Sequence, residues 1–170
     1  MPERDILQAA NELYSDRFGK GDLPMPPGRR LAIVTCMDAR LDPAKFLGLE
    51  EGDAHVIRNA GGLVTDDAIR SLIISHWLLG TQEVAVIAHT DCGMLTFTND
   101  DLRSKLREEA GSDATDIDFK PFPELDESVR SSLSAIRESP HLPDSLELSG
   151  WVYDVRSGRL TEVAEVGSPA

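Results

Sequence analysis

Uninterrupted runs of apolar residues predict the central strands of this chain. The runs at 31–35 and 84–88 lack the alternation of apolar and polar residues that a strand with one wet face shows. Strands buried on both faces are typical of parallel sheets that helices cover on each side. Further strands are predicted at 54–57, 148–155 and 160–163, and a turn at 156–159 allows the last two to form a hairpin.

Apolar residues recur at helical spacing between the strands. Helices are predicted at 6–18, 67–79, 101–110 and 124–137, and a short one begins at Asp42 and Pro43. The order of elements predicts an α/β fold: a mostly parallel central sheet of four strands plus an antiparallel edge strand, with helices on both faces. A length of 170 residues suits one domain, spanning 1–170.

The first 28 residues have a pattern of their own. The helix at 6–18 carries one apolar face, and the segment at 23–28, which contains three prolines, cannot be helical. An apolar-faced helix that a proline-rich linker holds away from its own domain often packs on a neighbour. Residues 1–28 are therefore predicted to form an N-terminal helical arm and linker, with the helix packing on a partner subunit.

The net charge argues against two classes of partner. Acidic residues outnumber basic residues 30 to 17, which gives a net charge of −13. Nucleic acids and anionic membrane surfaces both attract basic surfaces, so neither is expected as a partner, whereas a neutral small substrate is compatible with this charge. No basic segment followed by an apolar stretch opens the chain, and no apolar run is long enough to span a bilayer. The expected location is the cytoplasm.

The two cysteines lie near the ends of the two longest apolar runs. Cys36 follows the first run, and His89 and Cys92 follow the second. If these strands are parallel neighbours, the three side chains meet at the carboxyl edge of the sheet, where open α/β sheets bind their ligands. Thiolates and imidazole are zinc ligands, and three protein ligands leave the fourth tetrahedral position open, as in a catalytic site. The alternative is a buried histidine near two buried thiols, without a metal.

Two charged residues follow Cys36 at alternate positions. Asp38 and Arg40 project to one side in extended or turn-like backbone, so Asp38 can reach the open metal position or a metal-bound water while Arg40 pairs with it. The alternative is an ordinary surface ion pair. Asp91 could ligate the metal or tune the site, but capping of the helix that follows it is the favoured interpretation. For Arg58, binding of an anion and pairing with one of the many carboxylates both remain open.

Taken together, these motifs resemble those of the β-class carbonic anhydrases. The resemblance rests on Cys-x-Asp-x-Arg at 36–40, on His-x-x-Cys-Gly at 89–93 and on the Arg-Asn-Ala-Gly-Gly loop at 58–62. It covers about 31–93 well and the rest only as a general pattern. It implies a zinc lyase (a carbonate dehydratase) that converts CO2 reversibly to bicarbonate and a proton by zinc-bound hydroxide.

The same resemblance implies a role for each motif residue. Cys36, His89 and Cys92 are the implied ligands of one Zn2+ per chain, and Asp38 with Arg40 is the implied catalytic pair beside the open position. In a closed state of the family, Asp38 itself is the fourth ligand, and arginine competes with zinc for its carboxylate. Low activity at mildly acidic pH and higher activity above neutrality are therefore expected.

The resemblance also implies an assembly, and other functions remain open. The implied unit is a homodimer or a dimer of dimers, with the leading helix on the partner and CO2 and bicarbonate as small-molecule ligands. The same scaffold could hydrolyse CS2 or COS. A third possibility is a non-catalytic, redox-responsive zinc protein in which Cys36 and Cys92 form a reversible disulfide after metal loss.

Overall fold

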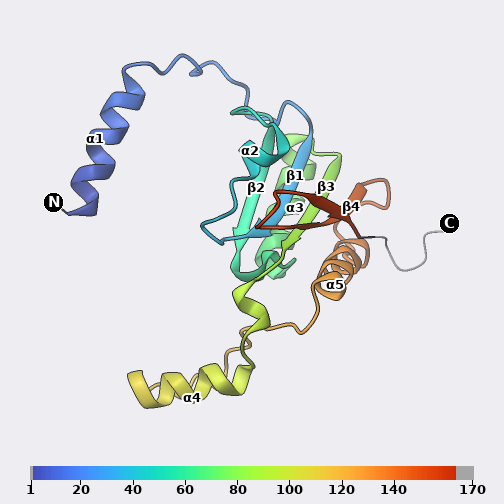
Figure 1. The fold of residues 1–170 in the computed structure, drawn as a ribbon. Helices are drawn as coiled ribbons and strands as arrows, with labels where there is room; N and C mark the ends of the chain where they lie inside the picture. Colours follow the sequence, from blue (N-terminus) through green and yellow to red (C-terminus); the bar gives the residue numbers. More distant parts are fainter. Residues whose placement is uncertain (1, 164–170) are drawn as a thin grey trace.

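A five-stranded sheet forms the centre of the computed structural model, which describes residues 2–163 (Figure 1). The strands lie in the order β2-β1-β3-β4-β5. Their bounds are β1 (Leu31–Cys36), β2 (Ala54–Asn59), β3 (Glu83–His89), β4 (Glu147–Tyr153) and β5 (Leu160–Glu162). The first four are parallel, and β5 pairs antiparallel with β4. The predicted α/β fold, with its mostly parallel sheet and antiparallel edge strand, is confirmed.

Helices connect the strands, and each begins within three residues of its predicted start. They are α1 (Glu3–Ser15), α2 (Pro43–Leu47), α3 (Asp66–Leu79), α4 (Asn99–Ala110) and α5 (Leu125–Arg137), with short 3-10 turns η1 (Ala60–Gly62) and η2 (Gly93–Leu95). Asp42 caps α2 and Thr65 caps α3 through side-chain hydrogen bonds to backbone N–H groups. Gly80 ends α3 in the left-handed conformation that glycine adopts at little cost.

The core lies on both faces of β1 and β3. On one face, Val34 and Val86 pack with Leu72 of α3 and with Leu133 of α5. On the other face, Ile33, Ala85 and Ile87 form a buried cluster against which residues of α2, β4 and β5 pack. Because both strands are buried on both faces, their register is fixed, and so is the position of the residues at their carboxyl ends.

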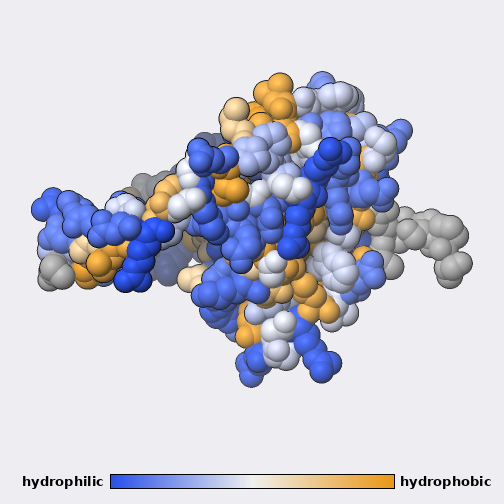
Figure 2. Space-filling view, turned by 90° about the horizontal axis from the view of Figure 1, so that it is seen from above, coloured by the Kyte–Doolittle hydropathy of each residue, from blue (hydrophilic) through white to orange (hydrophobic). Residues whose placement is uncertain are grey.

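Two helices stand away from this core. α1 contains no buried residue and lies apart from the sheet at the end of an extended linker, and α4 projects from the opposite side (Figure 1). Figure 2 shows apolar side chains on the surface of the arm. The exposed large apolar residues of the arm and linker are Ile6, Leu7, Leu13, Tyr14, Phe18, Leu23 and Met25. Among residues 2–163, no helix combines the length and apolar character needed to cross a membrane.

Candidate metal centre

The carboxyl ends of β1 and β3 bring three ligand side chains together. The two strands are parallel neighbours, with Thr35 paired to Ile87, so Cys36 and His89 end at the same edge of the sheet. Cys92 follows in the turn after β3. The potential ligand atoms of Cys36, His89 and Cys92 all lie within 4.8 Å of one another, and all three residues are buried. The strand-end placement inferred from the sequence therefore brings the three side chains into contact range of one ion.

The ring of His89 is oriented for a metal. Its Nδ1–H donates to the carbonyl oxygen of Thr90 at 2.9 Å, which leaves the lone pair of Nε2 facing the cluster. Among residues 2–163, Nε2 is the one buried side-chain nitrogen or oxygen atom without a hydrogen-bond partner. A buried polar atom without a partner costs about 1–3 kcal/mol. A cation bound between Nε2 and the two sulfurs would remove that cost, and thiolate and imidazole are the donor types that zinc prefers.

The two thiols of the centre differ in the direction of their pKa shifts. The hydrogen bond from the Cys92 thiol lowers the pKa of Cys36, although burial opposes the shift. The same hydrogen bond and the burial of Cys92 raise the pKa of Cys92 well above its ordinary value. Deprotonation of Cys36 is therefore favoured over deprotonation of Cys92. A metal binds cysteine as the thiolate, so binding at this centre is coupled to proton release.

Asp38 and Arg40 form a bidentate ion pair beside the cluster of Cys36, His89 and Cys92. The Arg40 Nε–H donates to Asp38 Oδ1 at 3.0 Å and the Nη2–H to Oδ2 at 2.8 Å, while the Arg40 backbone N–H also reaches Oδ1 at 2.9 Å. These bonds hold the pKa of Asp38 well below its usual range. Asp38 Oδ2 lies 3.8 Å from His89 Nε2. A charged carboxylate thus stands beside the position that an ion would occupy.

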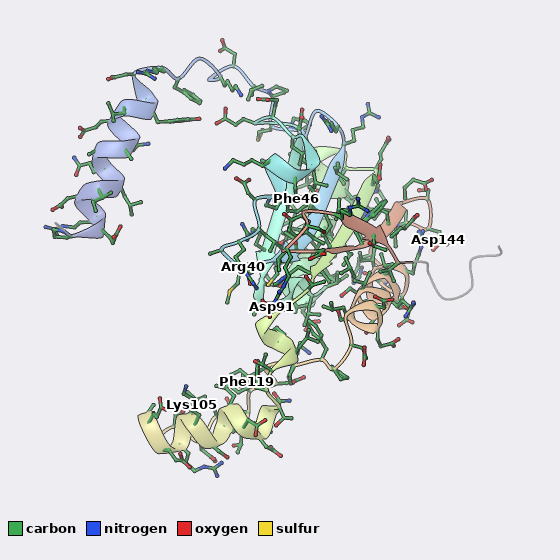
Figure 3. The ribbon with its side chains drawn as sticks, in the orientation of Figure 1. Arg40, Phe46, Asp91, Lys105, Phe119 and Asp144 are labelled. Carbon is green, nitrogen blue, oxygen red and sulfur yellow. The ribbon has the colours of Figure 1, made fainter. Side chains whose placement is uncertain are left out.

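Asp91 contacts Arg40, and the expectation that Asp91 caps the next helix is wrong. The Arg40 Nη1–H donates to Asp91 Oδ2 at 2.7 Å, and the Nη2–H donates to the Asp91 carbonyl oxygen at 2.9 Å. The turn η2 instead begins after Cys92 and has no side-chain cap. Figure 3 shows Arg40 and Asp91 next to each other at this end of the sheet. Arg40 therefore links the segment after β1 to the turn after β3.

Arg58 holds the backbone of the first ligand segment. Its Nε–H donates to the carbonyl oxygen of Cys36 at 2.9 Å and its Nη2–H to that of Asp38 at 2.7 Å. Both bonds go to main-chain oxygens and neither goes to a carboxylate. An isolated sequence offers no signal for this role, because a backbone carbonyl leaves no mark on residue type. The two bonds fix the path of the chain from the first ligand to the carboxylate.

Glycine is required where η1 passes under the end of β1. A Cβ on Gly62 would lie 2.7 Å from the backbone nitrogen of Cys36 and 2.8 Å from the carbonyl carbon of Thr35, closer than real Cβ atoms approach. Gly62 also has a φ of 66°, in the left-handed region. The glycines of the 58–62 loop thus allow the tight backbone near the site that the sequence predicts.

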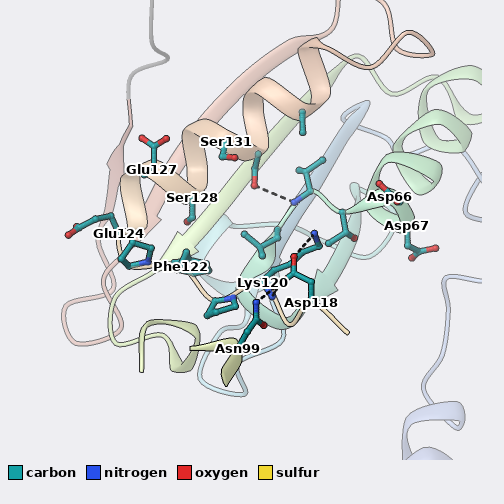
Figure 4. Close-up of a pocket in the computed structure, with 17 residues that line it drawn as sticks. Asp66, Asp67, Asn99, Asp118, Lys120, Phe122, Glu124, Glu127, Ser128 and Ser131 are labelled. Atoms are coloured by element: carbon teal, nitrogen blue, oxygen red, sulfur yellow. Dashed lines mark hydrogen bonds and ion pairs between the residues drawn. The ribbon is translucent and has the colours of Figure 1, made fainter. Parts of the chain in front are cut away.

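Apolar residues surround the centre, and a pocket lies beside it. Leu41 and Met94 are buried against the two cysteines, with Phe122 packed on them. A pocket of about 720 Å³ extends from Phe122 to the start of α3, and acidic side chains such as Glu127 lie along it (Figure 4). None of the three potential ligands lines this pocket. Apolar side chains and the Asp38–Arg40 pair therefore both border the centre, and the pocket shares Phe122 with the apolar part of that border.

Comparisons with known proteins agree on one family. The family model for carbonic anhydrase matches residues 31–160. "Beta-carbonic anhydrase 1" of Mycobacterium tuberculosis is 50% identical over 165 residues, which cover 96% of this chain and 99% of that protein. The crystal structure of carbonic anhydrase from Streptococcus mutans superposes with a TM-score of 0.93 at 49% identity, covering 96% of this chain and 99% of that one. "Carbon disulfide hydrolase" of Acidianus sp. is 35% identical over 179 residues, 91% of this chain and 86% of that protein.

Proposed function

Because this chain belongs to the β-carbonic anhydrase family, we propose that it is a zinc-dependent carbonic anhydrase. It interconverts CO2 and water with bicarbonate and a proton. The observation that carries the proposal is the cluster of Cys36, His89 and Cys92, with ligand atoms within 4.8 Å of one another. The Asp38–Arg40 pair beside it supports a catalytic site, because a purely structural zinc site does not need that pair.

The metal in this proposal is one Zn2+ per chain. The two sulfurs and His89 Nε2 would hold it and leave one tetrahedral position open. Zinc bound there supplies a Lewis acid that makes a coordinated water more acidic. Two thiolates cancel the double charge of the ion, so this acidification is weaker than with three neutral histidines.

The chain itself orients the reactants. Asp38, kept ionised by Arg40, can accept a hydrogen bond from a water beside the metal position and so fix the direction of its lone pairs. Leu41, Met94 and Phe122 form an apolar surrounding that suits a small neutral substrate such as CO2 and limits the access of bulk water. Asp38 as a fourth zinc ligand is the closed alternative of the same site, and its Oδ2 is 3.8 Å from His89 Nε2.

A second substrate is supported by the relatives that are named carbon disulfide hydrolase. The 35% identical protein of Acidianus sp. is named carbon disulfide hydrolase, so the same centre could hydrolyse CS2. CO2 is the first candidate because the relative at 50% identity is named beta-carbonic anhydrase. Rates of CO2 hydration and of CS2 hydrolysis, measured on the same zinc-loaded preparation, separate the two substrates.

One experiment tests the proposed activity and its metal together. Zinc content and CO2 hydration are measured for the reduced wild type, for Cys92→Ala and for Ser128→Ala, a control at a similarly buried position on α5. We expect one zinc per chain and activity in the wild type and the control, and the loss of both in Cys92→Ala. A fully zinc-loaded wild type that turns over neither CO2 nor CS2 would contradict the proposal and favour a non-catalytic zinc protein.

We also propose a homodimer, alone or paired into a dimer of dimers, in which α1 packs on the partner subunit. Supporting this, α1 has no buried residue, although Ile6, Leu7 and Leu13 form an exposed apolar surface. For location we propose the cytoplasm. The two buried cysteines are free thiols with close sulfurs, a state that a reducing compartment preserves.

A further inference from the structure

We infer that Asp91 is a positioning residue that holds Arg40 in place and, through Arg40, keeps the Asp38 carboxylate off the open metal position. The inference deepens the proposed function and rests on it, because it concerns how the same zinc site is kept open. Asp91 would touch neither the metal nor the substrate. Asp91 shifts the equilibrium between a site whose fourth metal position is open and a site in which Asp38 occupies that position.

The first step is the division of the Arg40 donors between two carboxylates. Nε–H and Nη2–H go to Asp38, at 3.0 and 2.8 Å. Nη1–H goes to Asp91 Oδ2 at 2.7 Å, and Nη2–H also reaches the Asp91 carbonyl oxygen at 2.9 Å. The guanidinium group is planar and its donors are fixed relative to one another, so the two bonds to Asp91 also orient the edge that faces Asp38.

The second step is where the two partners lie. Asp38 is two residues beyond the end of β1, and Asp91 is two residues beyond the end of β3 (Figure 3). Without the Asp91 carboxylate, Arg40 would keep only the bond to the Asp91 carbonyl oxygen as its link to the segment after β3, and it could move more easily with Asp38. With Asp91, Arg40 is anchored to the other ligand-bearing segment. Asp38 then has to give up both side-chain bonds from Arg40 before it can move toward a metal.

The third step is how small that movement is. Asp38 Oδ2 is 3.8 Å from His89 Nε2. Two ligand atoms on one tetrahedral ion with bonds of about 2.0–2.1 Å lie about 3.3 Å apart. The distance between Asp38 Oδ2 and His89 Nε2 therefore has to shrink by only several tenths of an ångström for both atoms to bind one ion. Because the open and closed positions are so close, the anchoring of Arg40 decides between them.

The backbone at Asp91 defines the right substitution. Its φ is 57°, in the left-handed region that asparagine and aspartate tolerate better than other side chains with a Cβ. Asp91→Asn therefore keeps the turn and removes only the charge, whereas alanine would add backbone strain. The side chains of Arg40 and Asp91 are 46% and 63% exposed, so solvent screens their interaction. An exposed pair of this kind corresponds to a change of about two- to fivefold in an equilibrium constant.

The test measures how open the metal position is. The protein is loaded with Co2+, whose visible spectrum reports coordination, and titrated with thiocyanate, which binds only where a ligand position is free. The wild type, Asp91→Asn, Asp38→Asn and the double variant are compared. Asp100→Asn is the matched control, since it breaks an ion pair with Arg103 on α4, a helix that stands away from the core.

We expect Asp91→Asn to raise the apparent Kd of thiocyanate in the wild-type background, by as much as about fivefold where the closed form predominates and by less where the open form does. Removal of a negative charge alone would instead strengthen anion binding. In the Asp38→Asn background no carboxylate can close the site, so Asp91→Asn should leave the Kd unchanged or lower it. Asp100→Asn should leave it unchanged in both backgrounds.

Two results would overturn the inference. One is an unchanged or lower Kd for Asp91→Asn in the wild-type background. The other is the same increase with and without Asp38, which would make Asp91 a structural crosslink that does not act through the carboxylate. A wild type that fails to bind one Co2+ per chain would instead refute the proposed metal centre, and the inference with it.

Discussion

Gly62→Ala should destabilise the protein by more than the strain of its backbone conformation. The added Cβ would meet the backbone nitrogen of Cys36 at 2.7 Å and the carbonyl carbon of Thr35 at 2.8 Å. Backbone atoms at the end of a buried strand cannot rotate away as a flexible side chain can. Either η1 or the end of β1 has to move, and the end of β1 carries one of the proposed zinc ligands.

A second glycine separates the two contributions. Gly48 has a φ of 62°, close to the 66° of Gly62, but a Cβ there would meet no atom within 4 Å. Gly48→Ala therefore costs the left-handed strain alone, about 1–2 kcal/mol. Gly62→Ala costs in addition the displacement of η1 or of the end of β1, which is comparable to overpacking a core and lowers the free energy of unfolding by about 1–3 kcal/mol. The free energy of unfolding should fall about 1–3 kcal/mol further for Gly62→Ala than for Gly48→Ala.

Urea unfolding of the reduced, metal-free variants measures this difference, and a zinc competition titration adds a second readout. Zinc affinity should fall for Gly62→Ala, because Cys36 is displaced, and should stay at the wild-type value for Gly48→Ala. Equal losses of stability in the two variants would refute the close approach of η1 to β1. Unchanged zinc affinity in a clearly destabilised Gly62→Ala would refute the link to the metal centre.

Three further changes have defined outcomes. Removing zinc with a chelator should lower the free energy of unfolding by about 2.7 kcal/mol when the free metal had been at 100 times its Kd, measured in urea with and without zinc. Arg40 depresses the pKa of Asp38, so this carboxylate stabilises the fold above its ordinary pKa of about 3.9, and the contribution is lost as the pH falls. The metal-free Asp38→Asn variant should therefore lose less free energy of unfolding than the metal-free wild type between about pH 5 and pH 3. Leu13→Asp on the apolar face of α1 should raise the dimer Kd at least about a hundredfold in sedimentation equilibrium. Gln8→Asp on the polar face of the same helix should leave the dimer Kd unchanged. An equal effect of both variants would indicate that the helix is lost and would contradict an interface on α1.

The sequence predicts the elements best where burial is strongest. β1 and β3 lie within one or two residues of the predicted runs, because strands buried on both faces are apolar throughout. The ligands follow from this, since Cys36 and His89 stand where those runs end. By contrast, α1 ends at Ser15, although its apolar spacing continues to Phe18. No residue of α1 is buried, so no packing extends the helix to the end of the pattern.

The partners of the charged residues were harder to predict. Asp91 pairs with Arg40, which is 51 positions away, and a chain with 30 acidic residues offers many possible partners for each arginine. Arg58 binds backbone oxygens, which every residue carries. These contacts depend on where the turns after β1 and β3 lie in space, and local sequence does not determine that. Residue types therefore indicate the proposed ligands, while only the fold shows which side chains hold the segments that carry them.

X-ray absorption at the zinc edge of the reduced, zinc-loaded protein tests the proposed ligand set most directly. Coordination by Cys36, His89 and Cys92 predicts two sulfur neighbours at about 2.3 Å and two nitrogen or oxygen neighbours at about 2.0–2.1 Å. One sulfur or none, or a zinc bound only by nitrogen and oxygen atoms, would contradict a metal held between the ends of β1 and β3.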